Sequence, residues 1–346
     1  MQLYVLNNTR TLTGIVEHFE YLRWTRRYFD CGSFELKAIA TPENTALLRV
    51  GNYLWKNDDD ECGVIESLEM SVTDKETIIV GGRFATSILA RRILWGTEVL
   101  SGDAGGNVGS LLNRHIRTPS DPARQIGYID YLDRTPYMAI QMQASYKNLL
   151  DVLFEICETH DAGLRTIYSP VTKRFTVDFY KAGAVQAVFS QEYENLNEQV
   201  YVENTAETAN TALIAGEGEG PARTLVPIIG GSGENRREIF VDAKDLRADD
   251  FPGAYPSALT FRGQSKLAER APVQSFDAAA NPHGNLRYKT DYDLGQAVTV
   301  ISKKWGIILN ARITEIEESY DVSGQLLNIT FGKGVLTLFQ KLKGAL

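Results

Sequence analysis

Two groups of carboxylates are the residues best able to do chemistry. Asp58, Asp59, Asp60 and Glu61 form one unbroken acidic run, and Glu217 and Glu219 alternate with glycine in GEGEG. Two carboxyl groups roughly 5 to 10 Å apart can hydrolyse a glycosidic bond by acid–base catalysis. Neither group is flanked by the aromatic residues expected of a sugar subsite, and the acidic run lacks the alternate spacing of an EF-hand loop. Both are therefore predicted to be solvated turns.

The histidines give no further sign of catalysis. His18, His115, His160 and His283 form no HxH or HExxH motif, and the chain has no GxSxG elbow and no phosphate-binding loop. His115 and His160 fall on apolar helix stripes, where a core histidine is expected rather than a ligand, and His283 lies in the turn sequence NPHGN. The sequence predicts no catalytic residue, no cofactor site and no metal site, and so no enzyme.

Basic residues cluster once, in RWTRRY at 23–28. In a strand, one face would carry Arg23, Thr25 and Arg27, and the other would carry Trp24, Arg26 and Tyr28. Interleaved arginines and aromatic rings are typical of a platform for single-stranded nucleic acid. An edge strand protected by arginines explains the pattern as well. The net charge of −8 favours the edge strand.

Composition narrows the class of protein. A chain of 346 residues, 43% of them hydrophobic, is long enough for two or three folded domains. The net charge argues against binding nucleic acid by phosphate neutralisation, but not against a conduit through which DNA slides. Cys31, Cys62 and Cys157 are widely spaced and indicate buried thiols, although a bridge between Cys31 and Cys62 stays open. We find no signal peptide and no apolar run long enough for a membrane span.

The two ends of the chain are rich in predicted strands. FELKAIA at 34–40 alternates apolar and polar residues, which predicts a half-buried strand. Further strands are expected at 3–6, 14–24, 52–56, 62–72 and 76–82 near the N-terminus, and at 237–246 and 271–279 later. Residues 210–226 are expected to form a strand, a Gly-rich bend and another strand. Three closing strands are expected at 291–300, 305–318 and 326–334. Short strands with turns at this spacing favour small antiparallel barrels or sandwiches.

The middle of the chain is predicted to be α+β. Residues 105–117 have the apolar spacing of an amphipathic helix. A second helix is expected at 145–161, capped by Ser145 and ended by Gly163, followed by a strand at 174–180. A third helix is expected at 255–270.

The predicted fold is therefore mainly β with α+β, in which two small antiparallel β-barrel-like domains flank an α+β domain. The barrel domain is assigned to 1–95, the α+β domain to 96–182, a second β-rich domain with one helix to 183–336, and a C-terminal tail to 337–346. These boundaries need not be continuous in the sequence.

Several segments, in order along nearly the whole chain, resemble the siphophage tail-hub (baseplate hub) family. They are EYLRWTRRYFDCGSFELKAIAT (20–41), GRFATSILARRI (82–93), NTALIAGEGEGPAR (210–223), and the closing pieces around Tyr292–Val300 and Phe331–Gly332. One departure is Gln296, where the family often has aspartate; the motif there is architectural.

The resemblance implies a structural protein of a phage or prophage tail. Three copies would form a ring whose six barrels match the sixfold tail tube, in the tail tip of the virion after assembly in the host cytoplasm. Expected partners are the distal tail protein and tail tube, the tape-measure protein, and fibre or receptor-binding proteins, with DNA as transient cargo. The acidic run Asp58, Asp59, Asp60 and Glu61 is expected to face the lumen.

The chain is expected to be a minimal hub without an appended hydrolase, because it ends soon after FGKG. Alternatives are a hub-like component of another injection machine, a distal-tail adaptor, a peptidoglycan or polysaccharide hydrolase, and a carbohydrate-binding β-module.

Overall fold

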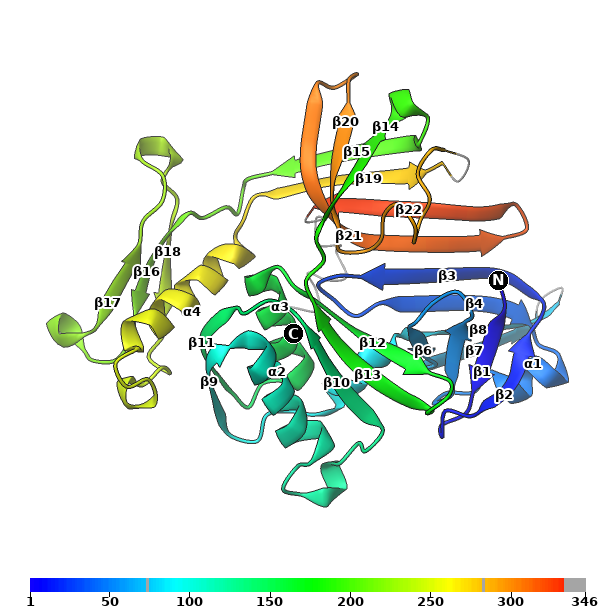
Figure 1. Cartoon of the computed structure of the whole chain (residues 1–346), viewed down its shortest axis with the longest axis horizontal. Helices are drawn as coiled ribbons and strands as arrows, with labels where there is room; N and C mark the ends of the chain where they lie inside the picture. Colours follow the sequence, from blue (N-terminus) through cyan, green and yellow to red (C-terminus); the bar gives the residue numbers. More distant parts are fainter. Residues whose placement is uncertain (73–74, 282–283, 333–346) are drawn as a thin grey trace.

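The computed structural model describes residues 1–72, 75–281 and 284–332 (Figure 1). Strands predominate, and helices gather in the middle of the chain, so the predicted mainly β fold with α+β parts is confirmed. The predicted C-terminal tail, 337–346, lies outside the described residues. Among the described helices, none is long and apolar enough to cross a membrane.

One long sheet joins strands from the two ends of the chain. Its order is β15–β19–β22–β21–β3–β4–β8–β7, and β20 pairs with β21 and with β14. The bounds are β3 Phe19–Arg27, β4 Ser33–Ile39, β7 Ser67–Val72, β8 Glu76–Arg83, β14 Ala184–Ser190, β15 Leu196–Asn204, β19 Val273–Ala280, β20 Ala297–Ser302, β21 Ile307–Asp321 and β22 Gly324–Gly332. Strands β3 and β21 pair antiparallel with Trp24 opposite Glu318, so the N-terminal and C-terminal strand sets meet at this ladder.

Strand β3 is central rather than an edge. It pairs with β4 on one side and with β21 on the other, so the prediction of an edge strand protected by arginines is wrong. The predicted alternation holds for Trp24 and Arg26, which are buried, and for Arg23, which is exposed. Periodicity identified the two faces of the strand, but the partner strand lies near the other end of the chain and left no local signal.

The three predicted closing strands are confirmed as β20, β21 and β22, which pair antiparallel in sequence order. The first begins later than predicted, because residues 291–296 form a loop that buries Tyr292 and Leu294. The last described residue of the third strand is Gly332; residues 333–334 of the predicted strand lie outside the described part.

A small sheet at the N-terminus packs against the long one. Its order is β2–β1–β5–β6, with β1 at Leu3–Leu6, β2 at Leu12–Val16, β5 at Tyr53–Lys56 and β6 at Cys62–Val64. The helix α1 (Pro42–Leu47) starts where the Thr41 hydroxyl accepts a hydrogen bond from the Asn44 amide at 3.1 Å.

The middle of the chain holds a three-stranded sheet, a two-stranded ladder and two helices. The strands are β9 Thr97–Asp103 paired with β11 Ala139–Ser145, and the sheet β10 Ile129–Arg134, β13 Arg174–Tyr180 and β12 Gly163–Ser169. The predicted helix at 105–117 is confirmed as α2 (Ala104–Leu112) and a π-helical turn, η2 (Asn113–Arg117). Asp103 caps α2 by accepting from the Gly106 amide at 3.0 Å.

The second helix, α3 (Leu149–His160), is shorter than predicted. Its cap is Asn148, which accepts from the Leu150 amide at 2.9 Å, because Ser145 is still part of β11. The left-handed residue at its end is Asp161, with φ of 53°, and not Gly163, which begins β12. Both predicted ends were therefore wrong, although the helix itself is present.

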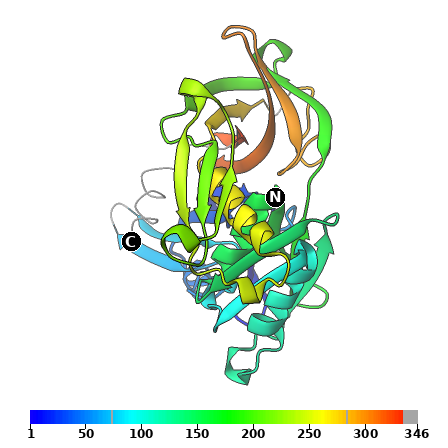
Figure 2. The ribbon, with the colours of Figure 1, turned by 90° about the vertical axis from the view of Figure 1, so that its left-hand side faces the viewer.

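A separate lobe is inserted between the paired strands β15 and β19 (Figure 1). Strands β17 (Leu225–Ile228), β16 (Thr211–Ala215) and β18 (Glu238–Asp242) form its sheet, in that order. The predicted helix at 255–270 is confirmed as α4 (Tyr255–Glu269), which covers one face of this sheet (Figure 2). Ala212, Ile214 and Leu259 are buried between the helix and the sheet.

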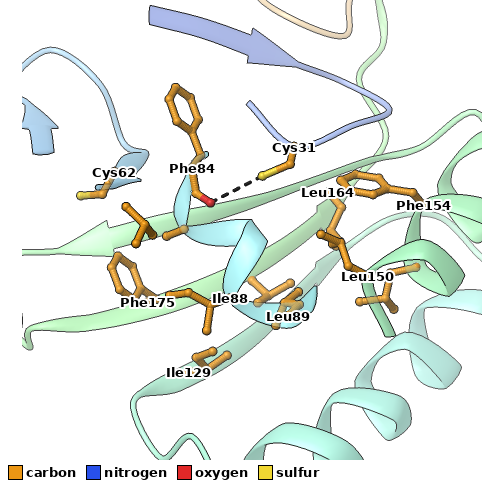
Figure 3. Packing of buried hydrophobic residues seen from close by; sticks show 14 of the residues in the cluster. Cys31, Cys62, Phe84, Ile88, Leu89, Ile129, Leu150, Phe154, Leu164 and Phe175 are labelled. Carbon is orange, nitrogen blue, oxygen red and sulfur yellow. Dashed lines mark hydrogen bonds between the residues drawn. The ribbon is translucent and has the colours of Figure 1, made fainter. Parts of the chain in front are cut away.

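Short 3-10 helices occur along the described chain, at η1 Ala85–Arg91, η3 Pro122–Arg124, η4 Gln191–Tyr193, η5 Gly220–Ala222, η6 Gly233–Asn235 and η7 Ala248–Asp250. The η1 segment lies inside a core that takes side chains from both the first strand-rich segment and the α+β middle, such as Cys62 and Phe175 (Figure 3). A second core packs Phe276 and Phe331 under the C-terminal strands. The predicted boundary near residue 95 therefore runs through continuous apolar packing.

The three cysteines are buried free thiols, as predicted, and Cys31 and Cys62 form no bridge. The Cys31 thiol contacts the Phe84 carbonyl oxygen at 3.5 Å (Figure 3).

Candidate functional site

Charged side chains converge where the N-terminal sheet, β3, β21 and the loop before β20 meet. We call this group the junction cluster. Its members are Arg26, Lys56, Asp59, Glu61, Lys289, Asp293 and Glu318. They come from segments far apart in the sequence, so the cluster ties the first strands of the chain to its last ones.

Arg26 is the centre of one half of the cluster. Its side chain, 3% exposed, points from β3 toward carboxylates on two other segments. Its Nη1 donates to Asp293 Oδ1 at 2.8 Å and to the Tyr288 hydroxyl at 2.9 Å, and its Nε donates to Glu61 Oε2 at 3.3 Å. A guanidinium has five N–H donors in a fixed plane, which suits it to bridge several acceptors at once.

Lys56 is the centre of the other half. It ends β5 and is fully buried, and its Nζ lies 2.6 Å from Glu318 Oε2 on β21 and 3.1 Å from Asp58 Oδ1. Lys289 connects the two halves, because its Nζ lies 3.5 Å from Asp59 Oδ2 and 3.8 Å from Glu318 Oε1. Every buried charge in the cluster thus has an opposite charge beside it, which is the condition for burying it at all.

Burial and charge act in opposite directions on the two buried acids of the β5–β6 turn. Burial would raise the pKa of Asp59, but Arg26, Lys289 and Lys56 outweigh it and hold that pKa below its ordinary value. Burial raises the pKa of Glu61 to about 7, since Arg26 compensates it only in part and Asp59 repels its charge. Counting Asp58 beside Lys56, the three cations face five carboxyl groups.

The predicted acidic run does not act as a unit. Asp59 and Glu61 are buried, and Asp59 also accepts a hydrogen bond from Trp24 Nε1 at 3.0 Å. Asp58 and Asp60 are exposed. The prediction of a solvated turn holds for these two alone, because the turn folds inward onto the arginine of β3.

The second predicted carboxylate pair belongs to a structural turn. A Glu217 oxygen accepts from the Ala248 amide at 2.9 Å, while Glu219 is exposed beside it. Glu217 thereby fixes the loop that leads into α4.

The three described histidines lie in different segments of the chain. His115 is buried in the turn after α2, where its Nε2 lies 2.8 Å from Glu98 Oε1. His160 ends α3, and burial lowers its pKa. His18 is exposed, and His283 lies outside the described residues. In the part of the chain that the structure describes, no group of three His, Cys, Asp or Glu side chains is arranged to hold a metal ion.

Sequence reasoning missed most of the junction cluster. Lys56, Lys289 and Glu318 stand among other polar residues and have no motif around them. The one available signal was Arg26, because a charged residue sharing a strand face with Trp24 must either be exposed or find buried partners.

The comparisons with known structures agree on one fold. The 43 kDa tail protein of prophage MuSo2 from Shewanella oneidensis matches with a TM-score of 0.65 and 14% identity, over 96% of this chain and 98% of that one. The tail protein from Neisseria meningitidis MC58 matches with a TM-score of 0.63 and 12% identity, over 96% of both chains. The prophage tail protein gp18 from Listeria monocytogenes EGD-e matches with a TM-score of 0.59 and 12% identity, over 99% of both chains.

The chain therefore has the same fold as these phage tail proteins. The family model described as "Siphovirus ReqiPepy6 Gp37-like protein" matches residues 2–333, and the chain belongs to this family. The resemblance to siphophage tail proteins drawn from the sequence is confirmed. A comparison with curated protein sequences returns no match.

Proposed function

We propose that this chain is the structural hub of a phage or prophage tail, and that three copies close into a ring that caps the tail tube. The observation that carries the proposal is the agreement in fold over whole chains: prophage tail proteins match at least 96% of this chain and of their own length. Membership of a siphovirus family over residues 2–333 supports the same role.

The junction cluster suits a protein that must withstand mechanical force. A hub must transmit force between the tube and the parts that meet the host, so its two strand sets must not separate. The Lys56–Glu318 pair joins β5 to β21, and the Arg26–Asp293 pair joins β3 to the loop before β20. Ion pairs therefore connect the N-terminal and C-terminal strand sets at the β3–β21 ladder, where a purely apolar contact would permit the strands to slip in register. Removing one partner of such a buried pair costs about 3 to 5 kcal/mol.

Two surfaces are suited to contacts between copies. One is the outer edge of β7, where Met70 and Val72 are 50% and 75% exposed at the end of the long sheet. An unpaired edge with apolar side chains is protected when a ring closes. The other is the outer face of the lobe sheet, opposite α4, where Leu213 lies across from Phe240 and both are exposed.

The exposed acids of the β5–β6 turn, Asp58 and Asp60, stay candidates for the lumen. In a ring their charge would repel DNA phosphates and let DNA pass without binding. The expected neighbours are the distal tail protein and tail tube, the tape-measure protein, and fibre or receptor-binding proteins, at the tail tip of the virion. We propose no catalytic role, because Asp59 and Glu61 are engaged in buried ion pairs and Glu217 holds a turn.

Light scattering on the purified protein tests the proposal. A particle with three times the 38.5 kDa mass of one chain is expected, and micrographs of it should show threefold rings. A monomer at all concentrations, together with hydrolysis of peptidoglycan or capsule by the same preparation, would favour the hydrolase instead. A monomer that binds glycans without cleaving them would favour a carbohydrate-binding module.

A further inference from the structure

The lobe formed by β16, β17, β18 and α4 is attached to the rest of the described chain, which we call the body, by two short connectors (Figure 1). Residues 205–210 lead into the lobe from β15, and residues 270–272 lead out of it to β19. Both connectors leave the same end of one ladder, because Asn204 lies opposite Val273. Two adjacent connectors attached at one point have the geometry of a hinge, which a few loop residues can provide.

The lobe has a hydrophobic core of its own. Ile214 and Val241 are buried in it, and Gly263 of α4 lies so close to the sheet that an added Cβ would meet the Ile214 side chain at 2.4 Å. Charged side chains of the lobe also pair within it, as Arg262 does with Asp245 at 2.9 Å. Helix α4 and its sheet therefore form one rigid unit.

The contact between α4 and the body involves α3 and β11 and is largely polar. The Gln143 side-chain amide of β11 donates to the Asp245 carbonyl oxygen at 3.1 Å. The Ser265 hydroxyl of α4 lies 3.5 Å from Glu155 Oε1 on α3, at the long limit for a hydrogen bond. Two parts of a chain that meet through a polar contact of this kind are free to move relative to each other, unlike parts that share a large apolar interface.

Buried polar atoms without a partner mark the same contact. Gln141 and Gln143 line a gap between β11 and α4 that is too small for a water molecule, and the Oε1 atom of each is buried without a hydrogen-bond partner among the described residues. The buried Nε2 atom of His160 has no such partner either, and its ring lies 5.7 Å from the Phe261 ring of α4, measured between centroids. Burying an unpaired polar group costs free energy that contact with water would recover. The closed contact is therefore less stable than a fully hydrogen-bonded one would be.

We propose that the lobe swings as a rigid body on its two connectors, between the closed position of the structure and an open one in which α4 leaves α3 and β11. The observations that carry the proposal are the adjacent connectors, the separate lobe core, and the three unpaired polar atoms at the contact. Opening hydrates Gln141, Gln143 and His160 and exposes Phe261, whose side chain is 9% exposed in the closed position. The motion belongs to the single chain, so it stands or falls independently of the proposed ring of three copies.

Thiol labelling of a buried position at the contact tests the swing. Ser265→Cys places a reporter on α4 where the side chain is 4% exposed, and Val241→Cys places a matched reporter in the lobe core, where the side chain is 6% exposed. The native Cys157, fully buried in α3, reports opening of the body. The Ser265→Cys thiol should react with a maleimide at least about tenfold faster than the other two, because a rigid swing exposes this face of α4 and leaves both cores closed.

Two results of this labelling would overturn the proposal. Equal rates at all three thiols would show that α4 leaves the body only when the whole chain unfolds. Equally fast labelling of Ser265→Cys and Val241→Cys, with Cys157 protected, would show that the lobe unfolds locally instead of swinging.

Substitutions at the contact test the cause of the motion. Gln141→Met with His160→Phe removes two unpaired polar atoms with little change in side-chain size, and should slow labelling of the Ser265→Cys thiol about fivefold by favouring the closed position. Phe261→Ala removes apolar packing and should speed that labelling about tenfold. His18→Phe, at an exposed position, is the control and should leave the rate unchanged. Labelling that does not slow in the chain with Gln141→Met and His160→Phe would contradict the proposal.

Discussion

The pair of Lys56 and Glu318 gives the sharpest test of the junction cluster. Lys56→Met keeps the length of the side chain but removes its charge, so Glu318 loses the ammonium 2.6 Å away. Glu318 retains the Tyr320 hydroxyl at 2.5 Å and Lys289 at 3.8 Å. We therefore expect the lower end of the cost of a broken buried ion pair, about 3 kcal/mol.

The corresponding change in melting temperature follows from chain length. With an unfolding entropy of about 2.1 cal/mol/K per residue, a cooperative unit of 346 residues loses about 4 °C for 3 kcal/mol. Calorimetry of the wild type and the variant measures this shift. Lys303→Met, at an exposed turn, is the control and should change stability by less than about 0.5 kcal/mol.

A double-mutant cycle separates the ion pair from side-chain packing. Lys56→Met with Glu318→Gln removes both charges, so it should cost about 1 to 3 kcal/mol less than the sum of the single changes. Lys56→Met could melt at the same temperature as the wild type, or the free-energy costs of the two substitutions could be strictly additive. Either result would show that the pair does not hold the two strand sets together and would refute the reasoning.

Three further predictions concern the pH response, a close approach of two strands, and the lobe. The pKa of Glu61 lies near 7, above its ordinary 4.5, so its stabilising proton is fully present below about pH 4.5 and is lost as the pH rises through 7. Between pH 5 and pH 8 the free energy of unfolding of Glu61→Gln should therefore rise relative to that of the wild type, by up to about 3 kcal/mol, and its melting temperature should rise with it. A difference between the two proteins that does not change with pH would contradict this. Gly82→Ala would bring a Cβ within 1.9 Å of the Val64 carbonyl oxygen and should destabilise the protein by about 3 kcal/mol in denaturant titration, whereas Gly127→Ala, with open space around it, should be nearly neutral. Phe240→Glu, on the exposed lobe face, should reduce the trimer fraction in light scattering without lowering the melting temperature of the monomer, and Val322→Glu should leave the trimer intact; equal trimer fractions would remove this face from the interface.

Helices were predicted well where residues within the helix itself determine its position. Helix α4 was expected at 255–270 and spans Tyr255–Glu269, because Pro256 and the apolar spacing are both typical of a helix and its first turn. The start of α3 was misplaced because Ser145 and Asn148 are both good caps, and only the pairing of β11 with β9 decides between them.

Non-local contacts explain the other failures. The strand at 19–27 was assigned to an edge because nothing near it shows that β21 will pair with it. The acidic run was predicted to be solvated because its partners, Arg26 and Lys289, lie far from it in the sequence. A buried charge is visible in a sequence only when its partner is close by, and here the partners come together through the sheet.

The central claim is that three copies of this chain close the end of a phage tail tube. Cryo-electron microscopy of assembled tails tests it most directly. The account predicts density for this fold in three copies around the tube axis at the tail tip, with β3 and β21 joined in each copy. Tails that lack the chain at the tip, or that carry it in a number other than three, would contradict the account.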